Sequence, residues 1–276
     1  MPLAAKKPRT TTFRQPEAGW VRPPLEGVAG TLATMVIDTI KQTAARAPRS
    51  LQASIGPSEI GTPCTRRLGY RILDWDPKPN SDTDPWPATV GTAVHAWLAD
   101  TFTAWNARLG AERFLIERRV TLPGGIPGNC DLYDRDTGTV IDWKTTGNTR
   151  LAKYRKNGPG DQYRTQAHLY GLGMLLAGEK PQDVAIVFLP RSGRLDGLHV
   201  WSEPFSHHVA VDALRRLQSM RDFHVYVDPE RHPERWEYLP TADAFCTYCP
   251  WFLPDSADLS QGCPGHKATE APSKEK

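Results

Sequence analysis

The sequence predicts a mixed α/β fold, and three observations support that class. Strand-like runs follow one another closely at 113–121, 127–134 and 139–144. Apolar residues at helical spacing precede and follow them, over 88–109 and 161–178. The segment VAIVFLP at 184–190 has the pattern of a buried strand. The order helix, three strands, helix, strand therefore indicates an α+β mixed sheet.

The other elements flank this core. Apolar residues at helical spacing predict a helix over 31–46, and Ser58 as N-cap begins a second predicted helix over 58–72. A proline-rich loop over 74–87 follows it, and a strand at 195–201 and a helix at 207–224 end the core.

Three parts of the chain are distinguished by composition. Residues 1–30 hold prolines and basic side chains with little apolar periodicity, so we expect a disordered or loosely attached arm. One domain is expected over 31–265, with a short disordered tail over 266–276. Within the domain we expect a core at 88–224 and a lobe built from 51–72 and 240–265.

Composition limits the possible functions. A chain of 276 residues with 39% hydrophobic content can bury a full core. Its net charge of +3 permits a polyanionic partner without requiring one. No apolar run approaches the ~18 residues of a membrane span, so we expect a cytoplasmic protein without a membrane partner. A phosphate-binding loop of a helicase motor is absent from the sequence.

The predicted hairpin brings two carboxylates together. Asp136, Thr137 and Gly138 form a tight-turn signal between strands 127–134 and 139–144. With the turn centred between Asp136 and Thr137, facing residue numbers sum to 273, which places Asp131 opposite Asp142. Like charges that face each other across strands are destabilising. We therefore expect a divalent cation between them.

The residues that follow Asp142 suit hydrolysis of a phosphodiester. Mg²⁺ or Mn²⁺ would take oxygen ligands from Asp131, Asp142 and the backbone carbonyl of Trp143. Lys144 points the same way as Asp142 on the strand, so it could act on the attacking water and on the phosphate charge. The alternative is a surface hairpin whose Asp and Lys form an ordinary cross-strand pair.

Four short motifs follow one another along the chain: Gly91-Thr-Ala-Val-His95, Gly128-Asn-Cys-Asp131, Ile141-Asp-Trp-Lys-Thr145 and Gln166-Ala-His-Leu-Tyr170. In this order they resemble the motifs of the PD-(D/E)XK nucleases and of their RecB-like branch. The resemblance implies a restriction-endonuclease-like core over roughly 51–265. It also implies that His95, Asp131 and Asp142 bind the metal, that Lys144 is the catalytic lysine, and that Gln166 and Tyr170 line the DNA side. Two departures are Asp rather than Glu in the Asp-x-Lys triplet, and Gln162 one turn before Gln166.

Five cysteines include one Cys-x-x-Cys pair, which favours a metal site over disulfides. Cys246, Cys249 and Cys263 resemble the C-terminal cluster of iron-sulfur RecB-like nucleases, in which Cys64 would be the fourth ligand of a 4Fe-4S cluster. Zinc is the alternative, since His266 follows Cys263 and would replace Cys64. The neighbouring aromatic residues are interpreted as packing around the cluster, with stacking on the bases of single-stranded DNA as the alternative: Phe245, Tyr248, Trp251 and Phe252.

The sequence thus favours a Mg²⁺- or Mn²⁺-dependent DNA exonuclease that acts on DNA ends or single strands in recombination, repair or phage DNA metabolism. Recombination or CRISPR-adaptation proteins are possible partners by the same resemblance. The alternative is a non-catalytic DNA-binding or recombination accessory protein with a zinc staple. Intact Asp131, Asp142 and Lys144 argue against that alternative.

Overall fold

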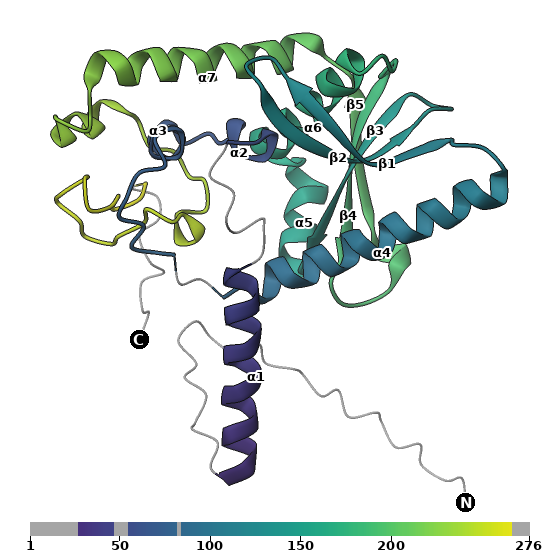
Figure 1. The fold of residues 1–276 in the computed structure, drawn as a ribbon, viewed down its shortest axis with the longest axis horizontal. Helices are drawn as coiled ribbons and strands as arrows, with labels where there is room; N and C mark the ends of the chain where they lie inside the picture. The colour runs from purple at the N-terminus through teal and green to yellow at the C-terminus, as the bar shows by residue number, and fades with distance from the viewer. Residues whose placement is uncertain (1–26, 47–54, 82–83, 267–276) are drawn as a thin grey trace, which may run out of the picture. The chain divides into compact units, whose positions relative to one another are not determined.

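The computed structural model describes residues 27–46, 55–81 and 84–266 (Figure 1). The chain divides into two units, the first ending at Thr43 and the second starting at Ala44. Most of the predicted N-terminal arm and all but the first residue of the predicted tail lie outside the described residues. No helix among the described residues is both long and apolar enough to cross a membrane.

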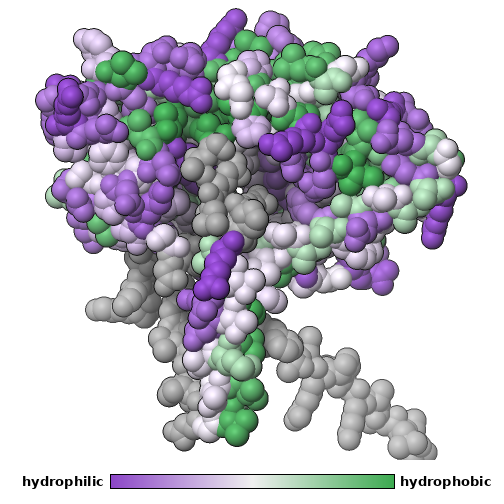
Figure 2. Space-filling model, in the orientation of Figure 1, coloured by the Kyte–Doolittle hydropathy of each residue, from purple (hydrophilic) through white to green (hydrophobic). Residues whose placement is uncertain are grey.

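Helix α1 (Gly27–Ala45) corresponds to the helix predicted over 31–46. It buries none of its residues. Its exposed apolar side chains gather on one side of the helix, as Figure 2 shows, and include Val28, Leu32, Met35, Val36 and Ile37.

The centre of the second unit is one five-stranded sheet of order β1-β2-β3-β4-β5. Its strands are β1 (Phe114–Leu122), β2 (Ile126–Asp134), β3 (Thr139–Thr146), β4 (Asp183–Pro190) and β5 (His199–Pro204). Strands β3 and β4 pair in parallel, while every other neighbouring pair is antiparallel. The sheet is therefore mixed, and the α/β class predicted from the sequence is confirmed.

The hairpin of β2 and β3 has the predicted register. Leu132 faces Ile141 and Tyr133 faces Val140, so facing numbers sum to 273. Gly138 in the turn has φ +66°, and a Cβ there would lie 2.8 Å from the carbonyl oxygen of Lys180. Only glycine meets both conditions without strain. The turn thus fixes which residues of β2 and β3 come together.

Helices cover both faces of the sheet (Figure 1). On one face lies α4 (Trp86–Leu109), whose Phe102 stacks on Trp143 with ring centroids 5.7 Å apart. On the other lie α5 (Asn148–Asn157) and α6 (Gly160–Leu176), both in the crossover from β3 to β4. A parallel pair of strands needs such a long connection. The central strand β3, which carries Asp142, thus lies between α4 and α6.

A second core joins distant parts of the chain. Helix α3 (Thr65–Ile72), helix α7 (His207–Val227) and the C-terminal segment share one apolar cluster, built around Tyr70, Trp236 and Trp251. The ring of Tyr70 lies 4.3 Å from that of Trp236 and 5.6 Å from that of Trp251. This cluster holds the C-terminal cysteine segment beside α3, as Figure 1 shows.

The structure differs from the predicted elements in three places. The helix predicted over 58–72 is two helices, α2 (Pro57–Ile60) and α3, because Gly61 ends the first and Pro63 disfavours helical backbone at residue 62. The strand predicted over 195–201 is a 3-10 turn, Leu195–Gly197, followed by β5. Helix α5 was not predicted, because it buries only Leu151 and so has little apolar periodicity.

Candidate active site and cysteine pocket

The two aspartates of the predicted site lie just beyond the paired part of the β2–β3 hairpin, on the side away from the turn. Asp131 is 9% exposed and Asp142 is 2% exposed. The backbone nitrogen of Trp143 donates to Asp131 Oδ2 at 2.9 Å, so the side chain of Asp131 reaches across to β3. Trp143 itself packs towards α4, as strand alternation predicts.

Asp142 is held from two sides. Lys144 Nζ pairs with its Oδ2, and Gln166 Nε2 donates to its Oδ1 at 2.9 Å. Burial raises the pKa of Asp142 to about 6, the charge of Lys144 opposes that rise, and the charge of Asp131 adds to it. Lys144 also lies over the ring of Tyr163, 4.9 Å from its centroid. The ammonium group of Lys144 therefore compensates the charge of a buried carboxylate, while 19% of the Lys144 side chain remains exposed.

His95 approaches this hairpin from α4. Its Nε2 lies 3.1 Å from the carbonyl oxygen of Trp143, and its Nδ1 lies 3.5 Å from Asp131 Oδ1. Because a carbonyl only accepts, Nε2 carries a hydrogen, and in the neutral ring the lone pair is on Nδ1, beside Asp131. Burial lowers the pKa of His95, but the hydrogen bond and charge of Asp131 outweigh it, so the net shift is upward.

Glu117 on β1 is a site residue that sequence reasoning missed. One ligand atom each of His95, Glu117 and Asp131 lies within 4.8 Å of the others. The β1–β2 register, with facing numbers that sum to 248, places Glu117 opposite Asp131. Glu117 also has φ +47°, an uncommon backbone conformation for a residue within a strand. The strand that carries Glu117 was predicted, but no local signal in that strand indicated its register with β2.

Gln166 and Tyr170 lie behind Asp142 on α6. They are 4% and 7% exposed, and Gln166 Nε2 lies 3.3 Å from the hydroxyl of Tyr170. Gly128 makes room for this arrangement, because a Cβ there would lie 3.1 Å from Tyr170 and 2.8 Å from Pro57. Gln166 therefore contacts the carboxylate of Asp142, Tyr170 contacts Gln166, and neither side chain faces solvent.

The donors fit a divalent cation. Carboxylate oxygens, an imidazole nitrogen and a carbonyl oxygen are ligands that Mg²⁺ and Mn²⁺ accept. His95, Glu117 and Asp131 form one compact group, and the carbonyl of Trp143 lies beside His95. Asp142 is not part of this group, and its two carboxylate oxygens contact Lys144 and Gln166.

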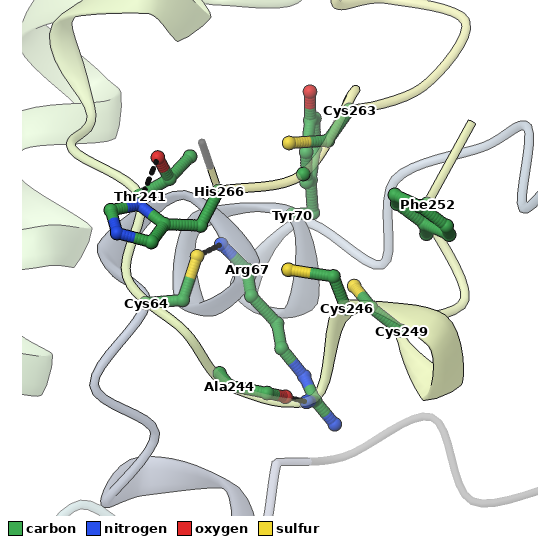
Figure 3. Close-up of a pocket in the computed structure, with 11 residues that line it drawn as sticks. Cys64, Arg67, Tyr70, Thr241, Ala244, Cys246, Cys249, Phe252, Cys263 and His266 are labelled. Atoms are coloured by element: carbon green, nitrogen blue, oxygen red, sulfur yellow. Dashed lines mark hydrogen bonds between the residues drawn. The ribbon is translucent and has the colours of Figure 1, made fainter. Parts of the chain in front are cut away.

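Four buried cysteines line a second site, a small pocket of about 20 Å³ in the cysteine lobe. Cys64 precedes α3, whereas Cys246, Cys249 and Cys263 come from the C-terminal segment, and all four face the pocket (Figure 3). Two N–H groups point at sulfurs. The backbone nitrogen of Arg67 lies 3.4 Å from Cys64 Sγ, and Arg66 Nη1 lies 3.7 Å from Cys263 Sγ.

The spacing of these sulfurs bears on which metal fits. Within 27–46, 55–81 and 84–266, no three of the cysteines and His266 have ligand atoms all within 4.8 Å of one another. Sulfurs around one tetrahedral zinc lie about 3.8 Å apart, given a Zn–S bond of about 2.3 Å. His266 Nδ1 lies 3.3 Å from Thr241 Oγ1, and Figure 3 shows its ring turned towards Thr241. The pocket as formed is wider than a single-zinc cage.

The remaining residues of this lobe divide into two groups. Trp251 is buried and Phe252 packs against the same core, as the sequence predicted for all four aromatics. Phe245 and Tyr248 instead are 52% and 59% exposed.

The fifth cysteine, Cys130, lies in the sheet core, away from the four pocket cysteines, and is fully buried.

Comparisons with known proteins give remote structural similarities only. No protein-family model and no curated protein sequence matches the chain. An alkaline exonuclease, LHK-Exo, from Laribacter hongkongensis is similar at 12% identity and a TM-score of 0.43, over 66% of this chain and 93% of that chain. The structure of LHK-Exo in complex with dAMP has 12% identity and a TM-score of 0.41, over 67% of this chain and 93% of that chain. A phage related exonuclease from Haemophilus somnus 129PT has 11% identity and a TM-score of 0.40, over 76% of this chain and 91% of that chain.

Proposed function

We propose that this protein is a metal-dependent deoxyribonuclease of the PD-(D/E)XK superfamily, in its RecB-like branch, and that it hydrolyses DNA from ends or in single strands. The observation that supports this most is the convergence of His95, Glu117 and Asp131 beside Asp142 and Lys144. An ordinary cross-strand pair would lie on the surface, whereas Asp142 is 2% exposed. Two buried aspartates beside an exposed glutamate, a histidine and one lysine are suited to cation binding and phosphoryl chemistry.

The protein groups have separate roles in this proposal. His95, Glu117, Asp131, Asp142 and the Trp143 carbonyl would hold the cation. The chemistry that a divalent cation supplies when bound is polarisation of a phosphoryl oxygen and a lowered pKa of water. Lys144 places a positive charge where negative charge develops on the phosphate, and it can orient the attacking water by hydrogen bonding. The exposed part of its side chain gives substrate access to that charge.

Gln166 and Tyr170 would be positioning residues. Gln166 donates to Asp142 Oδ1, so it fixes which oxygens of that carboxylate remain available to a cation. Tyr170 adjoins Gln166 and is buried with it. We expected both to line the DNA side, and their burial supports a role through Asp142 instead.

Cleavage of end-labelled DNA tests the proposal. Single- and double-stranded substrates are incubated with Mg²⁺ or Mn²⁺ and with wild type, Asp142→Asn or Asp136→Asn. Asp136 lies in the exposed turn of the same hairpin, so it is a matched control. We expect Asp142→Asn to reduce the rate by about 10³-fold and Asp136→Asn to leave it unchanged. Equal rates for wild type and Asp142→Asn would refute the assignment.

We further propose that Cys64, Cys246, Cys249 and Cys263 bind a 4Fe-4S cluster. All four sulfurs face one pocket, and their spacing exceeds that of a single-zinc cage. Burial raises the pKa of Cys249 to about 11, so its thiolate would form only together with the binding of a cationic centre. The N–H groups of Arg66 and Arg67 at two of the sulfurs would stabilise their charge.

Metal analysis with matched cysteine variants tests the cluster. Anaerobically purified wild type should be brown, with iron and acid-labile sulfide in about equal amounts. Cys64→Ala should lose the colour and lower the melting temperature, because the cluster would join α3 to the C-terminal segment. Cys130→Ala, in the sheet core, should keep the colour. Colourless, zinc-loaded wild type that loses its metal on His266→Ala but not on Cys64→Ala would favour the zinc alternative.

A further inference from the structure

Two exposed aromatic side chains lie beside the cysteine pocket. Phe245 and Tyr248 are 52% and 59% exposed, and they flank Cys246 in the short turn Cys246–Tyr248. Phe245 has φ +55°, a strained conformation for a residue with a side chain. Burial would stabilise two such rings, so their exposure next to a fixed pocket indicates a surface that meets a partner.

An arginine from the nuclease core orients both rings. The guanidinium carbon of Arg150 lies 4.7 Å from the ring centroid of Phe245 and 5.2 Å from that of Tyr248. Each contact is within the range of a cation–π interaction. Arg150 belongs to α5, so the cysteine lobe and α5 meet at these three side chains.

Helix α5 connects this surface to the candidate active site. It begins at Asn148, after β3 has ended at Thr146, so Arg150 is six residues beyond Lys144. The ring of Tyr154 on α5 lies 6.0 Å from that of Tyr163. Lys144 lies over the ring of Tyr163 at 4.9 Å. Helix α5 therefore contacts the aromatic pair through Arg150 and contacts the ring beneath Lys144 through Tyr154.

The charge of α5 complements a nucleic-acid backbone. The helix carries four basic residues and no acidic residue, the basic ones being Arg150, Lys153, Arg155 and Lys156. Lys153, Arg155 and Lys156 are exposed. Basic groups that follow a backbone beside aromatic rings that stack on bases are the general solution for binding single strands.

We propose that Phe245, Tyr248 and Arg150 form a stacking platform for the bases of single-stranded DNA, whose phosphates follow α5 towards Lys144. The inference rests on the proposed nuclease function and narrows its substrate to a single strand at the site. Paired bases in a duplex are already stacked on each other and cannot use the platform. The platform thus gives a preference for single strands or for unwound ends.

Binding measured without cleavage tests the platform. Fluorescence anisotropy of a short labelled oligodeoxythymidylate and of a blunt duplex is recorded in EDTA. We expect Tyr248→Leu to raise the Kd for the single strand about tenfold, since the strand loses one base–aromatic stack. Tyr248→Trp should retain wild-type affinity, and duplex binding should change less than twofold. Tyr238→Leu is the control, because Tyr238 is 61% exposed outside the platform.

A purely structural role for the rings predicts a different pattern. In that case Tyr248→Leu and Phe245→Leu would lower the melting temperature and iron content but leave the single-strand Kd unchanged, which would overturn the inference. If Phe245→Leu fails to fold, the Tyr248→Leu and Tyr248→Trp pair decides alone. Wild type that cleaves DNA while Tyr248→Leu binds normally refutes only the platform. Wild type that binds single strands through Tyr248 but cleaves no DNA refutes only the nuclease.

Discussion

Gln166 Nε2 donates a hydrogen bond to Asp142 Oδ1 at 2.9 Å, which joins α6 to the strand that carries Lys144. The other oxygen of Asp142 pairs with Lys144, so both oxygens of this buried carboxylate have assigned partners. A carboxylate fixed in this way cannot rotate without losing one of them. The orientation of Asp142 is thus set by Lys144 and by Gln166 of α6.

The first prediction concerns this hydrogen bond. Gln166→Leu should lower kcat by about 10- to 100-fold and leave KM for DNA nearly unchanged, because Gln166 acts through Asp142. Gln166→Glu should also lower kcat. The ratio of its kcat to that of wild type should rise as the pH falls, because the protonated carboxyl of the new side chain can donate to Asp142. The control is Gln162→Leu, since Gln162 donates to Ser58 at 2.7 Å one turn earlier. A change confined to KM would exclude a positioning role.

A second prediction follows from Glu117, whose strained backbone places a carboxylate beside His95 and Asp131. Glu117→Gln should weaken Mn²⁺ binding at least about tenfold while DNA binding in EDTA is unchanged. Glu112→Gln, an exposed acidic residue that pairs with Arg135, is the matched control. Titration calorimetry measures both variants, and identical Mn²⁺ affinities would remove Glu117 from the site.

The third prediction separates charge from metal binding at Lys144. Lys144→Ala should reduce cleavage by at least about 10²-fold, yet bind Mn²⁺ as tightly as wild type or more tightly, since a neighbouring positive charge is lost. The exposed Lys180 offers a control, Lys180→Ala. Loss of Mn²⁺ binding in Lys144→Ala would instead make Lys144 a structural partner of Asp142.

The fourth prediction concerns acid stability and His224 on α7. His224 is 6% exposed, no hydrogen-bond partner for either ring nitrogen lies among the described residues, and burial lowers its pKa to about 4. The unfolded chain therefore binds a proton below about pH 6.5 that the folded chain does not bind. From pH 7.5 to pH 5 this costs about 2 kcal/mol of the free energy of unfolding.

Chemical denaturation at several pH values measures this contribution. His224→Leu should flatten the dependence between pH 7.5 and pH 5, whereas His208→Gln, at an exposed position of the same helix, should retain it. An unchanged slope in His224→Leu would show that other groups cause the acid sensitivity.

Much of this architecture could be predicted because it depends on local signals. The Asp136–Gly138 turn fixes the register of β2 and β3, and the register places Asp131 and Asp142 at one end of the hairpin. Apolar periodicity predicted α4 and α6 within two residues of their observed ends. These elements follow from interactions among neighbours in the sequence.

Features that depend on long-range contacts were not predictable. Glu117 enters the site only through the β1–β2 register and its left-handed backbone, neither of which has a local signal in FLIERRVTL. The amphipathic pattern of α5 is weak, because the helix has several exposed basic residues and buries only Leu151. The exposure of Phe245 and Tyr248 depends on how Arg150 meets the cysteine lobe. Composition alone would have assigned both rings to the core.

The most direct test of the central proposal is cleavage of end-labelled single-stranded DNA by anaerobically purified wild type, first stripped of divalent cations with EDTA and then supplied with Mn²⁺. If His95, Glu117, Asp131 and Asp142 hold a catalytic cation, no product should form in EDTA, and short products should form once Mn²⁺ is added. Asp131→Asn measured in parallel should remain inactive at the same Mn²⁺ concentration. Cleavage by wild type that persists in EDTA, or folded wild type that binds Mn²⁺ and releases no product, would contradict the proposal.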